Sequence, residues 1–355
     1  MKESDHTQQG RILYTDFLRV ISIFFVFLLH AAATQKPQVE PYTYQWLVIN
    51  TTISIARWSV PVFLMISGYF FLNPKKKITI SQIFSKYIKR IVIAYLFWSL
   101  IYAIATTNSE IHALNPRAIW MIIEKTIRGH AHYWYLLMLI GLYIITPILK
   151  VMIQYAKEKT IQYFLVLGFI FSSFIPLLKN LTYCDIVNDL LAGLEVYLVL
   201  GYTFYYVLGY YLGNYELSRK TRIVCYLLGL IGALITSFGY FISTNILNSS
   251  SDLFQDYLVF SNVFMSVAIF VGVKQWLQYR TLGNRLEWIV HIIAKYSFGM
   301  YLTNDIFNIL FYICGITIFQ FGVIKGILLF TVIDFIGSYL LISILHKLPI
   351  LRNVC

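Results

Sequence analysis

The sequence predicts an all-α fold: a polytopic membrane helix bundle of about ten transmembrane helices, with the N- and C-termini in the cytoplasm. The chain of 355 residues is 59% hydrophobic and 12% charged, whereas about 25% of the residues of a soluble domain are charged. Its apolar residues fall into runs of about 20, the length that a helix needs to cross a bilayer. Its basic residues gather in every second connecting segment, as the positive-inside rule requires. This composition excludes an ordinary soluble enzyme, a disordered chain and a nucleic-acid-binding domain.

Ten apolar runs, bounded by Pro, Asn, Gly or clusters of charge, are predicted to span the membrane. In chain order they cover residues 12–33, 46–72, 90–107, 134–152, 160–178, 195–213, 222–243, 257–276, 289–311 and 322–346. A short break flanked by Gly315 and Gly322 separates the last two runs. Residues 116–128 are amphipathic, which is typical of a helix that lies in the membrane interface. Since no repeat or soluble linker interrupts the runs, residues 1–355 are expected to form a single integral-membrane domain with no fused soluble domain.

The distribution of charge gives the orientation of the chain. With the N-terminus inside, the cytoplasmic segments hold nineteen basic residues and the outer loops hold six. After acidic residues are counted, the inner side carries a net charge of +14, the outer side −2, and the spans are neutral. The total of +12 therefore reports membrane orientation rather than affinity for nucleic acid. A cleaved signal peptide is the alternative for the first run, but Arg19 interrupts its apolar stretch.

Three ionisable residues share one face of the first predicted helix. Asp16 precedes Arg19 by three residues, and His30 follows Arg19 by eleven, which returns to within about 20° of the same direction. Arg19 is expected in the cytoplasmic half, with His30 roughly 16 Å further along the helix, in the outer half. Ionisable side chains inside a bilayer cost several kcal/mol and mark functional sites by default. An interfacial anchor made by Asp16 and Arg19, with His30 simply hydrogen-bonded in the bundle, explains the same spacing.

The second run contributes two more polar positions. Arg57 lies too deep to reach the interface comfortably, which disfavours a purely anchoring role for the charges. Ser67 precedes Gly68, a pair that is a candidate nucleophile turn but far more often marks a close contact between helices. The four cysteines have no pairing or ligand spacing, so neither a disulfide framework nor a metal site is expected.

Five motifs occur in chain order. They are Asp16-Phe-Leu-Arg19 followed by His30; Arg57 to Pro61 and on to Ser67-Gly68-Tyr69; His132-Tyr-Trp134-Tyr135 with Gly141-Leu-Tyr143 and Thr146-Pro147; Thr203 to Gly209 and Gly213; and Tyr296-Ser297-Phe-Gly299-Met-Tyr301-Leu302. Together they resemble the integral-membrane acyltransferase 3 family, which includes bacterial surface-polysaccharide O-acetyltransferases. The resemblance covers nearly the whole chain.

Two positions depart from the family pattern. Asn304 stands where the family has a histidine after Tyr-Leu-x, and an amide cannot act as a base near pH 7. The basic loop before the third run reads Lys86-Tyr-Ile-Lys89-Arg90. The family has Arg-x-x-Arg in this loop, and Tyr87 stands where the first Arg of that pattern aligns. This weakens a bidentate phosphate contact, because Lys binds as a point charge.

The resemblance implies a multi-pass enzyme of the bacterial plasma membrane that moves an acyl group, usually acetyl, from cytoplasmic acyl-CoA to a glycan hydroxyl outside. We expect His30 to be the general base, Arg19 or Arg57 to stabilise the oxyanion, and Asp16 to orient Arg19. Acyl-CoA is expected to bind Arg90, Lys86, Lys89 and Ser67, whereas the run Lys75–Lys77 is explained equally well by orientation. The acceptor is expected near His132, Trp134, Tyr301 and Asn304. Acetyl-CoA enters as donor substrate, and no permanently bound cofactor is expected.

Other functions compete with this one. A transporter or flippase for a lipid-linked glycan also uses intramembrane charges, although neither inverted repeats nor paired broken helices are evident in the sequence. A sensor or scaffold with a degenerate site is a third hypothesis, favoured by Asn304. The expected partners of the acyltransferase are the lipid bilayer, acyl-CoA, a glycan or lipid-linked sugar, and in a relay scheme a separate extracytoplasmic transferase.

Overall fold

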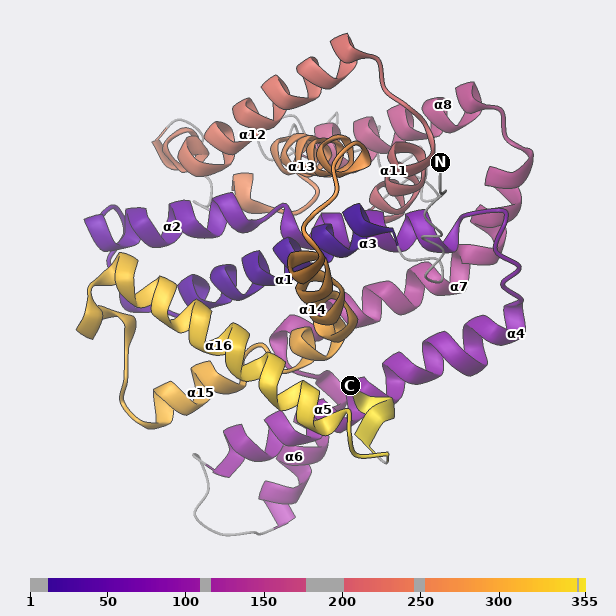
Figure 1. The fold of residues 1–355 in the computed structure, drawn as a ribbon. Coiled ribbons are helices and arrows are strands. Elements are labelled where there is room, and N and C mark those ends of the chain that lie inside the picture. Colours follow the sequence, from indigo (N-terminus) through magenta and orange to yellow (C-terminus); the bar gives the residue numbers. More distant parts are fainter. Residues whose placement is uncertain (1–11, 109–115, 177–200, 246–252, 350) are drawn as a thin grey trace, which may run out of the picture.

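Helix α1 (Leu13–Ala33) runs through the middle of a bundle of helices in the computed structural model (Figure 1). It packs against α2, α3, α13, α14 and α16, whose bounds are given below. The structure describes residues 12–108, 116–176, 201–245, 253–349 and 351–355, and no strand occurs in these ranges. The predicted all-α bundle is therefore confirmed, and the charged face of α1 lies inside it.

The helices follow one another in the order of Figure 1. The α-helices are α1, α2 (Tyr44–Ala56), α3 (Ser59–Phe71), α4 (Ile80–Gln82), α5 (Lys89–Asn108), α6 (Pro116–Arg128), α7 (Trp134–Tyr155), α8 (Glu158–Phe169), α11 (Thr203–Asn214), α12 (Arg219–Asn245), α13 (Phe260–Gln278), α14 (Asn284–Leu302), α15 (Ile306–Ile313) and α16 (Val323–Leu345). Shorter turns are η1 (Lys36–Gln38), η3 (Ala131–Tyr133), η6 (Leu253–Gln255), η7 (Ile318–Phe321) and η8 (Leu351–Val354), and the π-helical segments are η2 (Ile83–Ile88) and η4 (Ile170–Phe174).

Seven helical segments among the described residues are long and apolar enough to cross a membrane. They correspond to the first, second, third, fourth, seventh, eighth and tenth predicted runs. The fourth segment also includes α6, whose bounds match the predicted interfacial helix. The fifth run appears as α8 followed by η4, and its end lies outside the described residues. The sixth run is described only from residue 201, where it forms α11.

Two of the predicted spans are not continuous helices. The ninth, predicted over 289–311, is wrong as a single span, because α14 ends at Leu302 and α15 begins at Ile306. The polar side chains of Thr303, Asn304 and Asp305 fill the break, and such residues offer the backbone hydrogen bonds that compete with the helix. The second span is interrupted at Arg57 and Trp58, between α2 and α3.

Glycines allow the main chains of α3 and α11 to touch. A Cβ atom added at Gly68 would lie 1.7 Å from the main-chain oxygen of Tyr206, and one added at Gly209 would lie 1.9 Å from that of Met65. No side chain fits at either position, so the two helices pack backbone to backbone. The close-packing interpretation of the Ser67-Gly68 pair is thereby confirmed. This contact fixes α3 against α11, and Ser67, the neighbour of Gly68, lies at the wall of a cavity.

Candidate active site

The first polar group of the site joins the start of α1 to α14. Arg19 Nη1 donates to Asp16 Oδ1 at 2.6 Å, as the spacing of three residues suggests. The second oxygen of Asp16 lies 2.8 Å from His291 Nδ1, and His291 Nε2 lies 3.4 Å from Glu287 Oε1. Asp16 is only 4% exposed. Its carboxylate is therefore shared between a cation of its own helix and an imidazole of a helix that follows 275 residues later.

A cavity of about 150 Å³ extends from Arg19 into the bundle. Its polar lining consists of Arg19, Ser67, Tyr135, Tyr143, Ser297 and Tyr301, and its apolar lining of Val26, Val60, Phe63, Leu139 and Phe298. Ser67 donates its hydroxyl hydrogen to Phe63 of its own helix, at 3.0 Å. Ser67 therefore offers the cavity a hydroxyl oxygen, and no described base activates it as a nucleophile.

Arg90, which is exposed like Lys86 and Lys89, contacts a residue that lines this cavity. Its guanidinium stands 5.3 Å from the ring centre of Phe298, a lining residue, and Nη2 donates to the main-chain oxygen of Cys355 at 2.6 Å. Lys86 and Lys89 are exposed, and Lys86 lies over the neighbouring Tyr87 ring at 5.6 Å. Of the expected set, Arg19, Ser67 and Arg90 are brought together around one cavity.

Lys76 joins Arg19 at the same end of the bundle, and it was not among the preferred acyl-CoA residues. Its ammonium lies 4.3 Å from the ring centre of Phe70, which also carries the Arg19 guanidinium at 4.9 Å. Lys150 donates to the main-chain oxygen of Lys76. Partial burial, followed by the charges of Arg19 and Lys150, lowers the pKa of Lys76 below that of an ordinary lysine. This end therefore concentrates positive charge.

A cluster of histidines surrounds the other end of α1. The His30 and His132 rings approach edge to face, with centroids 5.6 Å apart. Nδ1 of His132 lies 2.8 Å from Nδ1 of His130, and His130 Nε2 lies 3.5 Å from Asp305 Oδ2. Asp305, His130 and Arg57 all act electrostatically on the His30 ring. His30 and His132 are among the residues that the sequence predicts for the site, whereas His130 and Asp305 are not.

The break between α14 and α15 supplies several buried polar atoms to this cluster. The side-chain N and O atoms of Asn304 have no hydrogen-bond partner, and Asn304 is fully buried. Both carboxylate oxygens of Asp334 from α16 are also unpartnered, as is Nε2 of His132. Asn308 Nδ2 donates to Asp305 at 3.1 Å. Buried polar groups without partners are costly, so each of them calls for a structural or functional explanation.

Tyrosine hydroxyls tie η3 to the end of α14. Tyr301 donates to the main-chain oxygen of His132. In the opposite direction, Tyr133 donates to the main-chain oxygen of Leu302 at 2.7 Å, and Tyr102 does so at 3.3 Å. Tyr301 also lines the cavity. It therefore links the cavity that begins at Arg19 to the histidine cluster.

Arg57 and Trp134 form a separate aromatic group on the His30 side. The Arg57 guanidinium lies 4.8 Å from the ring centre of Tyr257, and Trp134 lies 5.3 Å from the same ring, centroid to centroid. Arg57 acts electrostatically on His30, and its Nε is buried without a partner. Arg57 therefore belongs to the His30 end, and no described contact joins it to Arg19.

The histidine cluster also contains the residue types of a metal site. One ligand atom each from His130, His132 and Asp305 lies within 4.8 Å of the others. However, His130 presents Nδ1 to His132 and Nε2 to Asp305. One ion contacts only one nitrogen of a ring, at about 2.0–2.1 Å for zinc. The observed ring orientation fits a chain of hydrogen-bonding groups better than three ligands of one ion.

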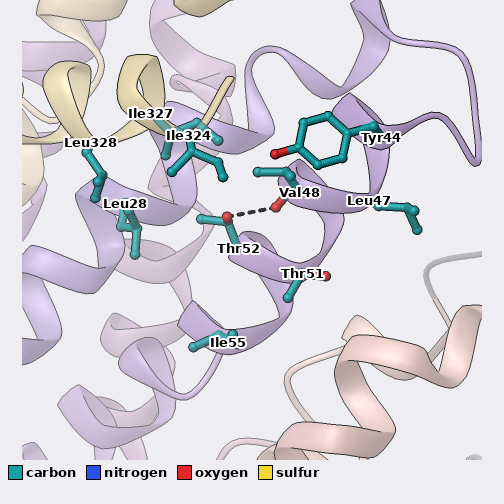
Figure 2. A pocket seen from close by; sticks show the side chains of 10 residues that line it. All are labelled: Leu28, Tyr44, Leu47, Val48, Thr51, Thr52, Ile55, Ile324, Ile327 and Leu328. Atoms are coloured by element: carbon teal, nitrogen blue, oxygen red, sulfur yellow. Dashed lines mark hydrogen bonds between the residues drawn. The ribbon is translucent and has the colours of Figure 1, made fainter. Parts of the chain in front are cut away.

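A larger groove of about 530 Å³ is lined by a different set of residues (Figure 2). It is formed by α1, α2 and α16 and is lined by Leu28, Tyr44, Leu47, Val48, Thr51, Thr52, Ile55, Ile324, Ile327 and Leu328. The Thr52 hydroxyl donates to Val48 of its own helix at 2.8 Å, as drawn in Figure 2. An open apolar groove suits lipid chains, and it contains none of the expected site residues.

The chain was compared with protein families, curated proteins and solved structures. The model of a family described as acyltransferase domain matches residues 12–346. No curated protein matches the chain, and no solved structure does. The match covers α1 to α16, and so includes both ends of the site.

Proposed function

The chain belongs to the acyltransferase 3 family, and we propose that it is a membrane O-acyltransferase that moves an acetyl group from acetyl-CoA to a hydroxyl of a cell-surface or lipid-linked glycan. A multi-pass membrane acyltransferase is established by the family and by the helices. The acetyl donor, the glycan acceptor and the location in a bacterial plasma membrane are the proposed part.

The observation that supports the proposal is a cavity that begins at Arg19 and has in its wall Tyr301, whose ring contacts His132 of the histidine cluster. At one end, Arg19, Lys76 and Arg90 gather positive charge, which favours the phosphates of CoA. The charge distribution of the sequence predicts that this end faces the cytoplasm, where acyl-CoA is available. Asp16 keeps Arg19 oriented. The narrow cavity beyond Arg19 is suited to the pantetheine arm and its thioester.

At the other end, imidazoles are available for the acceptor. The acceptor oxygen attacks the thioester carbon, a C–O bond forms, and the C–S bond to CoA breaks. His30 takes the hydroxyl proton, which finally moves to the sulfur, so that the products are an ester and a free thiol. Arg57 lies close enough to act on His30 and provides positive charge for the developing oxyanion. Asn304, His132 and Trp134 are the proposed acceptor contacts.

Mass spectrometry of surface glycans tests the proposal directly. Cells that contain the protein should carry glycans heavier by one acetyl unit than cells without it. The variant His30→Ala should lose this difference, because removing a general base costs about 10²–10⁴-fold in rate. His346→Ala, which alters a histidine at the end of α16 packed on Tyr296, is the matched control and should acetylate normally. Full acetylation by His30→Ala at equal membrane level would contradict the assignment of the base.

A flippase for a lipid-linked glycan is the second candidate, and one observation favours it. The break between α14 and α15 places unpartnered polar groups inside the bundle, and transporters use such discontinuous helices to bind substrates. The two functions differ in their consumption of donor. Vesicles containing the protein should release free CoA only when acetyl-CoA and acceptor are both supplied. Movement of glycan across the vesicle membrane without CoA release would favour the flippase.

A further inference from the structure

Asp305, His130 and His132 form a chain that the proposed reaction leaves without a role. His130 stands in the middle, with Nε2 3.5 Å from Asp305 Oδ2 and Nδ1 2.8 Å from His132 Nδ1. The side chains of His130 and Asp305 are 19% and 13% exposed, and His132 is 4% exposed. The three groups come from η3 and from the break after α14, so the fold rather than local sequence brings them together.

The short distance between Nδ1 of His130 and Nδ1 of His132 determines how many protons lie between these two nitrogens. Two nitrogens at 2.8 Å require one N–H and one lone pair, so the pair shares one proton across its hydrogen bond. A further proton makes the pair a cation, which is costly in a low-dielectric interior unless an anion is adjacent. Asp305 supplies that anion at the His130 side. The chain can therefore take up one additional proton and become neutral as a whole.

Among the groups around this chain, the histidines are the ones available to take up the additional proton. The hydroxyls of Tyr301, Tyr133 and Tyr102 are directed to main-chain oxygens. The other charged or titratable groups near the chain are His30 of α1, Arg57 after α2 and Asp334 of α16. His132 Nε2 is buried without a partner. The chain thus ends at the His132 ring, which meets His30 edge to face.

We propose that Asp305, His130 and His132 form a proton-holding chain for His30. After His30 removes the proton of the acceptor hydroxyl, the proton passes to the His132–His130 pair, where Asp305 offsets its charge. When the C–S bond breaks, the proton returns through His30 to the CoA sulfur, so no proton is gained or lost overall. His130 and Asp305 are positioning residues that act through His132. The catalytic part of this inference rests on the proposed function, but the hydrogen bond between the rings does not.

The first measurement examines the hydrogen bond and needs no substrate. The full-length protein, labelled with ¹⁵N-histidine and reconstituted in lipid nanodiscs, should show a ¹⁵N–¹⁵N coupling between His130 and His132 across the shared proton. His130→Gln should abolish the coupling. Absence of the coupling in the unsubstituted protein would overturn the chain. Zinc retained at one ion per chain, with both rings bound to it, would overturn it in favour of a metal site.

The second measurement examines the use of the chain in turnover. His130→Gln keeps a hydrogen-bonding side chain that cannot take a proton, and Asp305→Asn removes the anion. Both should lower kcat by about 10–100-fold, less than loss of the base itself, and leave KM for acetyl-CoA unchanged. Asp305→Glu retains the carboxylate and should stay within about threefold of the unsubstituted kcat. Wild-type kcat in His130→Gln would overturn the proposal. If the unsubstituted protein transfers no acetyl group, the proposed function fails. The ¹⁵N–¹⁵N coupling then remains as the test of whether His130 and His132 share a proton.

Discussion

Replacing Asp16 by Asn should destabilise the protein by breaking the link between α1 and α14. Asp16 is 4% exposed. Its carboxylate accepts a hydrogen bond from Arg19 at 2.6 Å and lies 2.8 Å from His291 Nδ1. Hydrogen bonds to charged groups contribute about 1.5–3 kcal/mol each, against about 0.5–1.5 kcal/mol for neutral ones. Losing the charge from two such contacts gives a cost of about 2–3 kcal/mol. The Arg19 side chain is 29% exposed, so water offsets part of its loss and places the expected cost near 2 kcal/mol.

The free energy of unfolding can be measured by titrating the purified protein with SDS in mixed micelles and following helix content. Glu287→Gln is the matched control, because Glu287 also faces His291, at 3.4 Å, but its side chain is 39% exposed. Exposed pairs contribute about 0–1 kcal/mol, so this variant should unfold almost as the unsubstituted protein does. Equal losses of unfolding free energy in the two variants would refute the reasoning, since burial would then have no influence on how much a carboxylate stabilises the protein.

Three further predictions follow from contacts elsewhere in the bundle. Gly68→Ala should lower the free energy of unfolding by at least about 3 kcal/mol or prevent folding, because its Cβ would lie 1.7 Å from a main-chain oxygen of α11. Gly141→Ala is the control: its Cβ would have no atom within 4 Å, so the same SDS titration should show no change. Because burial and neighbouring cations lower the pKa of Lys76, it loses its proton at a lower pH than an ordinary lysine. The affinity for acetyl-CoA should therefore fall by up to about fivefold as the pH rises through the range in which Lys76 loses its proton. An affinity that falls equally in Lys76→Arg would count against this contact. Tyr133→Phe removes a hydrogen bond to the Leu302 oxygen and should cost about 1 kcal/mol, whereas no change in unfolding free energy would mean that water replaces the hydroxyl.

Periodicity predicted the part of the site that lies on one helix. Asp16 and Arg19 are three residues apart, and their ion pair follows from the geometry of one turn. The position of His30 on the same face of α1 follows from the same period. The amphipathic pattern over 116–128 also predicted α6, because an interfacial helix shows its polar face in the sequence itself.

Contacts between distant segments could not be predicted in this way. His291 meets Asp16 across 275 residues, and its sequence context shows only that it follows Glu287 by one helical turn. Likewise, Asp305 meets His130 only because α14 stops at Leu302 beside η3. The signal for the break was the polar stretch that begins at Thr303, which an apolar average over 289–311 conceals. Pairing of such residues depends on helix packing, and a single sequence does not specify which helices are neighbours.

The broken helix explains why tyrosine, rather than phenylalanine, surrounds the histidines. A helix that ends inside a membrane leaves carbonyl oxygens that water cannot reach, and each unsatisfied group costs several kcal/mol. At the end of α14, the Leu302 oxygen accepts from Tyr133 and Tyr102. Each ring also fills apolar space, so one residue type satisfies the backbone and packs the bundle. The same hydroxyls would otherwise compete for the imidazole nitrogens. Because these hydroxyls bind the main chain, they do not occupy His132 Nε2, which the proposed proton-holding chain uses.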